Sequence, residues 1–390
     1  MRILIVHPEG NTLHNPTLTA MLDLCAEHDC SMVVLGKRRP GGQDLAPHVM
    51  WIRESKWFWL FKNMLLRGSF CAWFVRFICF MQYLMFLRLH PCDLVLGVDR
   101  EGVIQGSWFA RMLNTQYGLL SFEITFEQET SREYKQLERE ACRKIAFVLS
   151  QDRLRMQQLL LENKINNAEI FCLPIATRGP RSFSAEPRLR DVLGIPKDKN
   201  VAIMMGTVAD WTLSDVIVKG ISDWPEDWVL FVHDRYGNTR KKLQACGMNE
   251  KDYQRVVFCS STPLDSAGDL SYLLSGVRAG IAFYRMQEGH PLMGNNIRFM
   301  GKSSGKISTY LQHGIPIIVN SVGGWASDVR KYDLGVVVED ERSLGAALAG
   351  ITDKQRGNCL RFFAEYMDFA NYQNTLWDLI ERYAGCHGKR

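Results

Sequence analysis

The sequence predicts an α/β protein made of two doubly wound domains, each a parallel sheet with helices on both faces. Three observations lead to this fold class. The chain has 390 residues, which is enough for two domains with cores of their own. Short, wholly apolar runs alternate with amphipathic segments, as in parallel βαβ units. A stretch rich in Gly, Pro and polar residues interrupts this alternation at 177–187, and the alternation then resumes.

The first domain is predicted to span residues 1–176, with 177–187 as a linker. Apolar runs predict strands at 3–6, 32–35, 93–98, 119–122, 146–150 and 169–173. Apolar residues spaced three and four apart predict helices at 17–28, 106–114, 132–142 and 153–162.

The second domain is predicted to span residues 188–352 and to repeat the same alternation. Strands are expected at 201–205, 228–233, 256–259, 280–284, 315–320 and 335–338, with a helix near 213–221. Helices within 353–390 are candidates to cross back to the first domain. Because ligands of such sheets bind at the carboxyl ends of strands, we expect the two domains to face a central cleft.

The composition narrows the class of ligand and the compartment. A net charge of +5 suits anionic small molecules or an anionic membrane surface, and it is too weak to indicate nucleic acid. The 11 cysteines form no CxxC pair, so we expect reduced thiols in a cytoplasmic protein.

Residues 57–90 are dense in Trp, Phe, Leu and Met, with interleaved Lys and Arg and no acid. The longest uncharged run, 77–87, is well short of the ~20 residues that a membrane-spanning helix needs. Aromatic residues with interleaved bases are typical of helices that lie on an anionic membrane. The alternative is that these residues form core helices packed on the first sheet, and both interpretations stay open.

The segment GKSSGK at 301–306 has the residue types of a phosphate site. Glycines let backbone N–H groups converge on an anion, and serine hydroxyls and a lysine complete the cradle. A helix predicted to begin near Ser304 would add partial positive charge, and Gly314 is expected to end it. A plain Gly/Ser loop is the alternative.

Residues 306–319, KISTYLQHGIPIIV, resemble the donor-domain motif of GT-B glycosyltransferases, which have two Rossmann-like domains and use nucleotide sugars. Five other segments resemble that family in the same order along the chain: 117–124 (YGLLSFEI), 137–155, 205–211 (MGTVADW), 229–235 and 280–284 (GIAFY). The likeness is to retaining, glycogen-synthase-type and bacterial cell-surface transferases. It implies a hexosyltransferase with a nucleotide-sugar donor and a glycan or lipid-linked acceptor, of the kind found in lipopolysaccharide and cell-surface polysaccharide biosynthesis.

The chain departs from the family at two acids. The family's acids at the start of the donor loop and in the following helix correspond to Gly301 and Thr309. Lys306 is therefore expected to carry much of the diphosphate binding. The donor site that the resemblance implies comprises Gly206, Thr207, His233, Asn295, Ser303, Ser304, Gly305, Lys306 and Thr309.

The resemblance also implies how the reaction would proceed. A lysine and backbone donors would stabilise charge on the leaving diphosphate. Because no convincing metal-binding Asp-x-Asp occurs, we predict no required metal and no other cofactor. Glu123 is a candidate base or acceptor-orienting group, and Glu288 a candidate contact for the donor sugar. The alternative for Glu123 is a capping or ion-paired carboxylate.

His7 and Asp99 follow predicted strands and are candidates for acceptor binding. The alternatives are a solvated loop histidine and a loop role for Asp99 and Glu101. The sequence as a whole predicts a retaining, metal-independent glycosyltransferase that docks on the inner membrane face. The alternatives are another GT-B enzyme, such as a nucleotide-sugar epimerase or a phosphorylase, and a non-catalytic binding or partner subunit.

Overall fold

The computed structural model describes residues 1–8, 12, 15–36, 48–53, 81, 85, 87–181, 193–234, 238–248, 250, 253, 257–260 and 267–385. Two compact units make up the chain: Met1–Leu173 with Tyr372–Arg390, and Pro174–Asn371. Most of the aromatic and basic stretch at 57–90 lies outside the described residues. Within the described part, no helix has the length and apolar character needed to cross a membrane.

The first unit contains a seven-stranded parallel sheet in the order β3-β2-β1-β4-β5-β6-β7. The chain therefore reverses direction across the sheet between β1 and β4, which makes a topological switch point. Strand β3 was not predicted from the sequence. The strands are β1 (Arg2–His7), β2 (Ser31–Gly36), β3 (Val49–Arg53), β4 (Leu94–Val98), β5 (Gln116–Leu120), β6 (Phe147–Ser150) and β7 (Glu169–Cys172).

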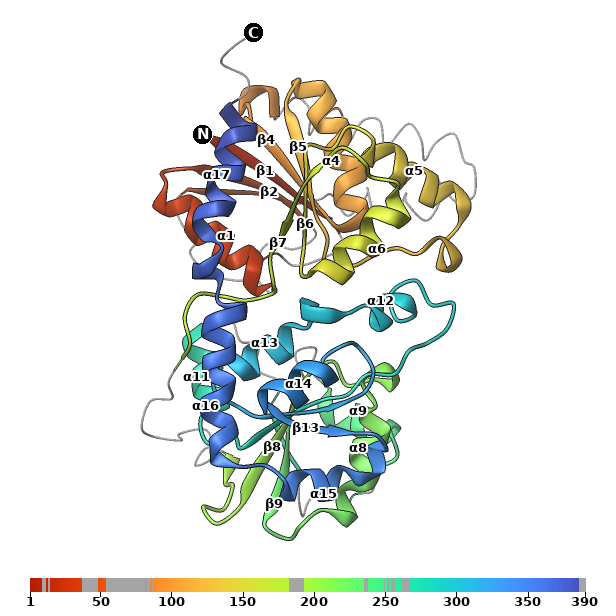
Figure 1. The fold of residues 1–390 in the computed structure, drawn as a ribbon, viewed down its shortest axis with the longest axis vertical. Coiled ribbons are helices and arrows are strands. Elements are labelled where there is room, and N and C mark those ends of the chain that lie inside the picture. Colours follow the sequence, from red (N-terminus) through yellow and green to blue (C-terminus); the bar gives the residue numbers. More distant parts are fainter. Residues whose placement is uncertain are drawn as a thin grey trace. The chain divides into compact units, whose positions relative to one another are not determined.

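Helices cover both faces of this sheet (Figure 1). One face is covered by α1 (Pro16–Glu27) and α17 (Gln373–Ala384). His28, the C-cap of α1, stacks on Trp377 within α17 with ring centroids 3.9 Å apart. The other face carries α4 (Asp99–Leu113), α5 (Arg132–Cys142), α6 (Arg153–Asn163) and the short helix η2 (Glu127–Glu129).

Helix α4 begins at Asp99, well before the start at residue 106 that the sequence predicts. Glycines lower helix propensity, and for this reason the first turns, which contain Gly102 and Gly106, were not predicted to be helical. The structure needs both positions to be small. A Cβ at Gly102 would lie 2.3 Å from the carbonyl oxygen of Val6, and one at Gly106 would lie 3.3 Å from Val95. The helix therefore packs directly against the backbone of the sheet, and Asp99 and Glu101 lie in its first turn instead of in a loop.

The second unit contains a six-stranded parallel sheet in the order β10-β9-β8-β11-β12-β13. Its strands are β8 (Asn200–Gly206), β9 (Trp228–Asp234), β10 (Val257–Ser260), β11 (Ala279–Ala282), β12 (Ile317–Asn320) and β13 (Gly335–Val338). Each of these strands lies at or within a residue or two of a run predicted from the sequence.

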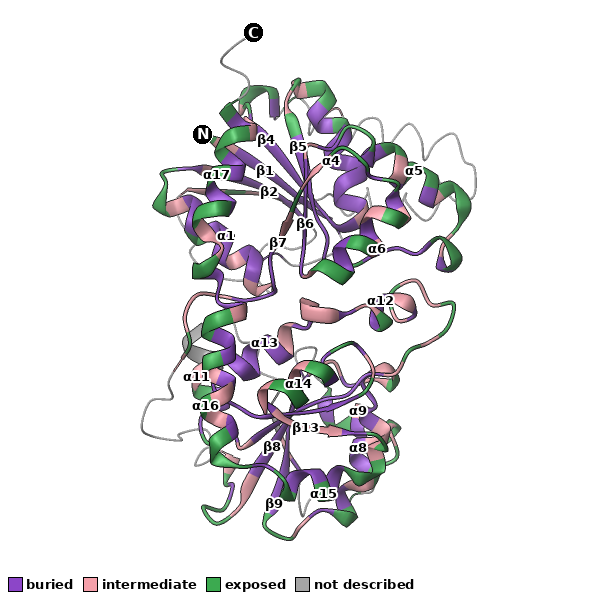
Figure 2. Ribbon diagram, viewed as in Figure 1, coloured by how far each residue is buried: buried purple, intermediate pink, exposed green. Residues whose placement is uncertain are grey.

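Two hydrophobic cores lie on opposite faces of this sheet, and strand residues alternate between them. Ile203 and Phe231 belong to the core beneath α11 (Ala267–Leu274), α13 (Gly305–Gln312), α14 (Ala326–Tyr332) and α16 (Asp353–Phe362). Ala202 and Leu230 belong to the core beneath α8 (Ser214–Lys219), α9 (Thr239–Ala245) and α15 (Leu344–Ala349). Burial on both faces explains why these strands are apolar throughout (Figure 2).

Short helices complete the second unit. They are α12 (Asn295–Arg298), the π-helix η7 (Phe363–Met367), and the 3₁₀ turns η3 (Asp210–Thr212), η4 (Gly220–Asp223), η5 (Gly301–Ser303), η6 (Glu341–Ser343) and η8 (Phe369–Asn371).

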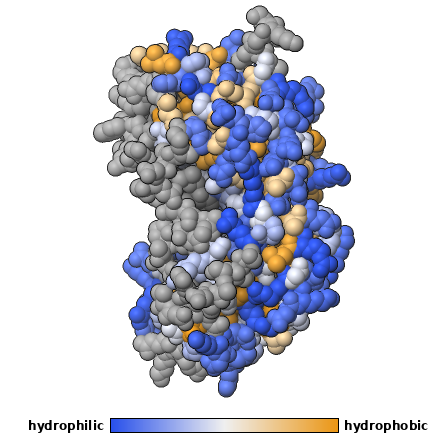
Figure 3. Space-filling view, turned by 90° about the vertical axis from the view of Figure 1, so that its left-hand side faces the viewer, coloured by the Kyte–Doolittle hydropathy of each residue, from blue (hydrophilic) through white to orange (hydrophobic). Residues whose placement is uncertain are grey.

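The described surface shown in Figure 3 mixes hydrophilic and apolar residues. Exposed large apolar side chains include Trp108 and Met112 on α4 and Leu154 and Leu161 on α6. Single exposed apolar residues are ordinary on soluble proteins and need no partner to explain them.

Candidate functional site

The candidate donor site of the second unit forms where β8, β11 and β12 end. Gly206, the last residue of β8, has φ of 105°, and a Cβ there would meet no atom within 4 Å. A side chain is disfavoured by the backbone conformation and not by crowding, so the space above this glycine is open. Thr207 follows and is partly exposed.

The loops that follow β8 and β11 are tied together by Arg285. Its guanidinium pairs with Asp210 and lies 3.6 Å from the carboxylate of Asp215, while its backbone N–H donates to the carbonyl of Trp211 at 2.8 Å. Gln287 also donates to Asp210 at 3.0 Å. These contacts hold the two loops as one layer above the strand ends.

An aromatic pair lies in this layer. Trp211 and Tyr284 stack with ring centroids 6.0 Å apart and an interplanar angle of 21°. The Tyr284 hydroxyl lies 2.7 Å from Oγ of Ser304, and both side chains are buried. Burial raises the pKa of Tyr284, so its hydroxyl keeps its proton near neutral pH.

Helix α13 begins at this point, as the sequence predicts. Ser304 is its N-cap and accepts a hydrogen bond from the backbone N–H of Ile307 at 3.4 Å. Helix α13 ends at Gln312, and Gly314 follows with φ of 62°, the left-handed conformation predicted for a helix stop.

Two of the predicted donor hydroxyls are occupied by the backbone. Ser303 donates to the carbonyl of Met300 at 2.7 Å. Thr309 is only 8% exposed and donates to the carbonyl of Gly305 at 2.9 Å, one helical turn earlier. Thr309 therefore does not present its hydroxyl in the way that the family's acid would present a carboxylate.

Lys306 is the cation of this site. Its Nζ lies 4.9 Å from the ring centroid of Tyr284 and 5.9 Å from that of Trp211. Within the described part of the chain, its ammonium has no recorded hydrogen bond or carboxylate partner, although the residue keeps partial exposure. Burial lowers the pKa of Lys306 from 10.5 to about 8. A cation held against aromatic faces in the first turn of a helix favours an anionic ligand.

The other predicted donor residues lie on neighbouring loops. His233 is in β9 and is 4% exposed. Glu288 is exposed in the loop between β11 and α12, and Asn295 begins α12 and is partly exposed. His290 shapes this loop by accepting hydrogen bonds from the backbone N–H groups of residues 292 and 293 at 3.2 and 3.1 Å. Among the described residues, no hydrogen bond joins Glu288 to Lys306, Tyr284 or Trp211.

In the described part of the chain, no group of three or more His, Cys, Asp or Glu side chains gathers closely enough to hold an ion.

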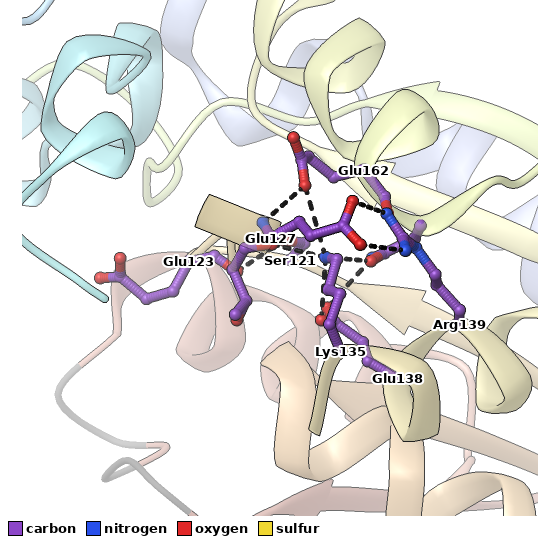
Figure 4. Close-up of polar contacts among 9 residues, drawn as sticks. Ser121, Glu123, Glu127, Lys135, Glu138, Arg139 and Glu162 are labelled. Atoms are coloured by element: carbon purple, nitrogen blue, oxygen red, sulfur yellow. Dashed lines mark hydrogen bonds and ion pairs between the residues drawn. The ribbon is translucent and has the colours of Figure 1, made fainter. Parts of the chain in front are cut away.

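The first unit presents Glu123 on a turn. Strand β5 ends at Leu120, so Glu123 lies beyond the strand instead of at its end. Its side chain is exposed and points away from the polar network in Figure 4. Oδ1 of Asp99 accepts hydrogen bonds from the backbone N–H groups of Phe122 and Glu123 at 2.6 and 2.8 Å. The Ser121 hydroxyl donates to the carbonyl of Glu123 at 3.1 Å.

Two further buried side chains hold the same turn. Gln151 donates to the carbonyl of Ser121 at 2.7 Å, and the guanidinium of Arg155 donates to the carbonyl of Phe122. Burial lowers the pKa of Arg155, and the negative charges of Glu123 and Asp99 oppose that change. A fully buried cation therefore lies within electrostatic reach of the exposed Glu123 carboxylate.

A second network supports the segment after this turn (Figure 4). The ammonium of Lys135, which is fully buried, donates to the carbonyl of Thr125 and to Glu138 and Asn163 at 2.5, 3.0 and 2.5 Å. Burial raises the pKa of Glu138, and the ion pair with Lys135 opposes the rise. Arg139 forms a bidentate pair with Glu127 nearby.

The two predicted acceptor-binding residues are both buried. His7 is 5% exposed with Nδ1 3.1 Å from Oγ1 of Thr12, so the reading as a solvated loop histidine is wrong. Asp99 is 8% exposed and has φ of 57°, and its Oδ1 is taken up by the Phe122–Glu123 turn. The structure thus gives Asp99 a role in shaping that turn, from the first turn of a helix.

Three residues that organise the donor side were not predicted from the sequence. Trp211 stacks on Tyr284, Arg285 joins two loops, and Asn320 at the end of β12 hydrogen-bonds the backbone of Tyr284. Only Asn320 carried a local signal, because it is a polar residue that ends a buried apolar run.

Comparison with known proteins places this arrangement in context. Residues 235–367, which include Tyr284, Lys306 and Asn320, match the family described as glucosyltransferase 3-like, C-terminal domain. No curated protein sequence matches the chain.

Solved structures share the fold over almost the whole chain. HepE from Anabaena, in complex with UDP and glucose, has a TM-score of 0.70 at 11% identity and covers 98% of this chain and 100% of its own. A glycosyltransferase from Rickettsia africae has a TM-score of 0.71 at 11% identity, covering 98% of both chains. WaaG, a glycosyltransferase involved in lipopolysaccharide biosynthesis, has a TM-score of 0.65 at 14% identity, covering 97% of this chain and 99% of its own.

The chain thus has the two-sheet fold of GT-B glycosyltransferase structures, and residues 235–367 match a glucosyltransferase-like C-terminal domain. The predicted fold class is confirmed by the two parallel sheets and by these structures. The predicted enzyme class, a transferase, is confirmed at the level of the glucosyltransferase-like domain.

Proposed function

We propose that this protein transfers a sugar, in the first instance glucose, from a uridine diphosphate donor to a glycan or lipid-linked acceptor. The observation that carries the proposal is the Lys306 ammonium, which lies against Tyr284 and Trp211 with no carboxylate recorded as its partner among the described residues. The choice of UDP-glucose is supported by the matched glucosyltransferase-like domain and by the UDP and UDP-glucose complexes of HepE.

The chemistry follows from where charge develops. When the bond between sugar and phosphate breaks, negative charge grows on the leaving diphosphate. Lys306 and the first turn of α13 supply positive charge at one place, the open side of the β8, β11 and β12 strand ends. The same buried environment that lowers the pKa of Lys306 also strengthens its electrostatic attraction to an anion.

The remaining parts of the proposal rest on the sequence resemblance. We infer a retaining reaction that needs no metal, with the diphosphate accepting the acceptor's proton and with Glu123 orienting the acceptor. We also infer a cytoplasmic protein that binds the inner membrane face through residues 57–90. The kinship of fold with WaaG, a lipopolysaccharide enzyme, supports an acceptor in a cell-surface glycan.

Calorimetry with UDP, GDP, CMP and dTDP tests donor binding directly. We expect UDP to bind, and Lys306→Ala to weaken it by about 10- to 100-fold, the range for a hydrogen bond to a charged group. The matched control is Lys331→Ala, which removes a lysine on α14 whose ammonium lies 4.7 Å from the Tyr332 ring, and it should leave UDP affinity unchanged. The proposal fails if none of the nucleotides binds, or if Lys306→Ala binds UDP as tightly as the native chain.

Turnover separates the enzyme from its alternatives. UDP-glucose should be consumed faster when a glycan acceptor is added, and EDTA should leave the rate unchanged. Interconversion of sugar epimers without acceptor would indicate an epimerase instead. Tight UDP binding with no turnover of UDP-glucose, with or without acceptor, would indicate a non-catalytic binding subunit.

A further inference from the structure

The side chain of Asn320 replaces a piece of the sheet. Strands β11 and β12 pair as parallel neighbours up to Ala282 and Val319. Beyond that pair, the backbone N–H of Tyr284 donates to Oδ1 of Asn320 at 3.2 Å, and Nδ2 of Asn320 donates to the carbonyl of Tyr284 at 2.8 Å. A primary amide offers the same donor and acceptor as a peptide group, so it continues the ladder where the strands separate.

A third contact fixes this amide in one orientation. Nδ2 of Asn320 also donates to Oε1 of Glu341 at 2.8 Å. The Tyr284 carbonyl and the Glu341 carboxylate can only accept, so both must face the amide nitrogen, and the Tyr284 N–H must face the amide oxygen. Only one orientation of the Asn320 amide satisfies all three bonds. Asn320 is 1% exposed, so water does not compete for these bonds.

Tyr284 is consequently held at both ends. Its backbone is bound to Asn320, and its hydroxyl is bound to Ser304 Oγ at 2.7 Å, which is the N-cap of α13. The ring between these anchors is 4% exposed and stacks on Trp211. One residue therefore connects the ends of two strands to the start of the helix that carries Lys306.

The Tyr284 ring determines where the Lys306 ammonium lies. Its Nζ lies 4.9 Å from the ring centroid of Tyr284 and 5.9 Å from that of Trp211. We propose that Asn320 and Tyr284 are positioning residues, which fix the Lys306 ammonium where the diphosphate of the donor binds. This inference rests on the proposed function, because it assumes that Lys306 binds the diphosphate.

A double-mutant cycle with UDP as the probe tests the inference. Calorimetry on Asn320→Ala should show about tenfold weaker binding, the contribution of roughly one hydrogen bond. In a Lys306→Ala background, the same substitution should have almost no further effect, because the group that it positions is gone. A purely structural role for Asn320 predicts the same fold-loss in both backgrounds, and that result would overturn the inference.

Tyr284→Phe provides the second arm, because it keeps the ring and removes only the hydroxyl bound to Ser304. It should also weaken UDP binding in the native background and not in Lys306→Ala. Asn358→Ala is the matched control, since it removes an amide that donates to the carbonyl and carboxylate of Asp333 at 3.1 and 3.2 Å. It should leave UDP affinity unchanged.

The outcomes distinguish this inference from the proposed function. If the native chain does not bind UDP, the proposed function fails. If the native chain binds UDP and Lys306→Ala weakens it, but the effects of Asn320→Ala and Tyr284→Phe add to that loss, only the positioning role fails. If Asn320→Ala does not fold, the Tyr284→Phe cycle decides the question.

Discussion

Nucleotide affinity should depend on pH through Lys306. In the free protein, burial lowers the pKa of this ammonium to about 8. The terminal phosphate of UDP has a second pKa of about 6, so its charge is constant above pH 7.5. Bound diphosphate favours the protonated lysine, and binding above pH 8 must therefore take up a proton.

The size of the effect follows from the fraction of charged lysine. With a pKa of about 8, Lys306 is about three-quarters protonated at pH 7.5 and about one-tenth protonated at pH 9. If only the charged form binds, UDP affinity falls by about eightfold across this range. Calorimetry in buffers of different ionisation enthalpy should also detect the proton taken up.

Lys306→Arg is the control for this prediction. Its guanidinium stays charged through pH 9, so UDP affinity in this variant should change little across the range. The reasoning is refuted if the native chain shows a flat profile, or if Lys306→Arg shows the same eightfold fall.

The lowered pKa of Lys306 affects stability in the opposite direction: UDP affinity should fall as pH rises, whereas the contribution of Lys306 to the free energy of unfolding should increase. The folded pKa of about 8 lies below the unfolded value of 10.5, so the native state binds fewer protons between these limits. The free energy of unfolding should therefore rise as pH increases from 8 towards 10.5, at up to about 1.4 kcal/mol per pH unit from this group. Burial raises the pKa of Cys142, Cys359 and Tyr310, which lowers the stability of both chains over this range. The contribution of Lys306 should therefore be seen in urea denaturation as a rise in the stability of the native chain relative to Lys306→Met.

Four further substitutions test the two units. Glu123→Gln should lower turnover about a hundredfold and change the free energy of unfolding by less than about 0.5 kcal/mol, because the side chain is exposed. Asp99→Ala should cost about 2–4 kcal/mol in urea denaturation, since one buried and one partly buried N–H group lose their acceptor, whereas Asp99→Asn should cost less. Lys135→Met should cost about 3–5 kcal/mol by the same assay, because Glu138 stays buried without its cation. Gly335→Ala should cost at least about 3 kcal/mol, since its φ is 150° and a Cβ would lie 1.9 Å from the carbonyl oxygen of Ile317. If Asp99→Ala, Lys135→Met or Gly335→Ala lowered the free energy of unfolding by less than about 1 kcal/mol, that result would contradict the packing described.

Local patterns were enough to predict the described strands other than β3, and the start of helix α13. Fully apolar runs identify strands buried on both faces, and Ser304 with Gly314 marks the ends of α13. These features depend on residues close together in the sequence. The early start of α4 was missed because the sheet contact that makes Gly102 favourable involves Val6, far away in the chain.

The chemistry of the candidate sites was less predictable for the same physical reason. Asp99 looked like a polar group after a strand, and only the fold shows that Phe122 and Glu123 use its carboxylate. Lys306 was predicted from its spacing to Gly314 and Pro316, but the aromatic rings beside it, Trp211 and Tyr284, come from two other segments of the chain. Contacts between residues that are 20 to 100 positions apart leave no periodic trace in a single sequence.

Helix α17 has a consequence for how the protein is made. Its buried residues Leu376, Leu379 and Ile380 belong to the first unit, whose other residues end at Leu173. The second unit is continuous in sequence, from Pro174 to Asn371. During synthesis, the second unit can therefore fold as soon as it leaves the ribosome, while the first sheet waits with one face short of a helix. The domain that begins the chain is the last to be completed.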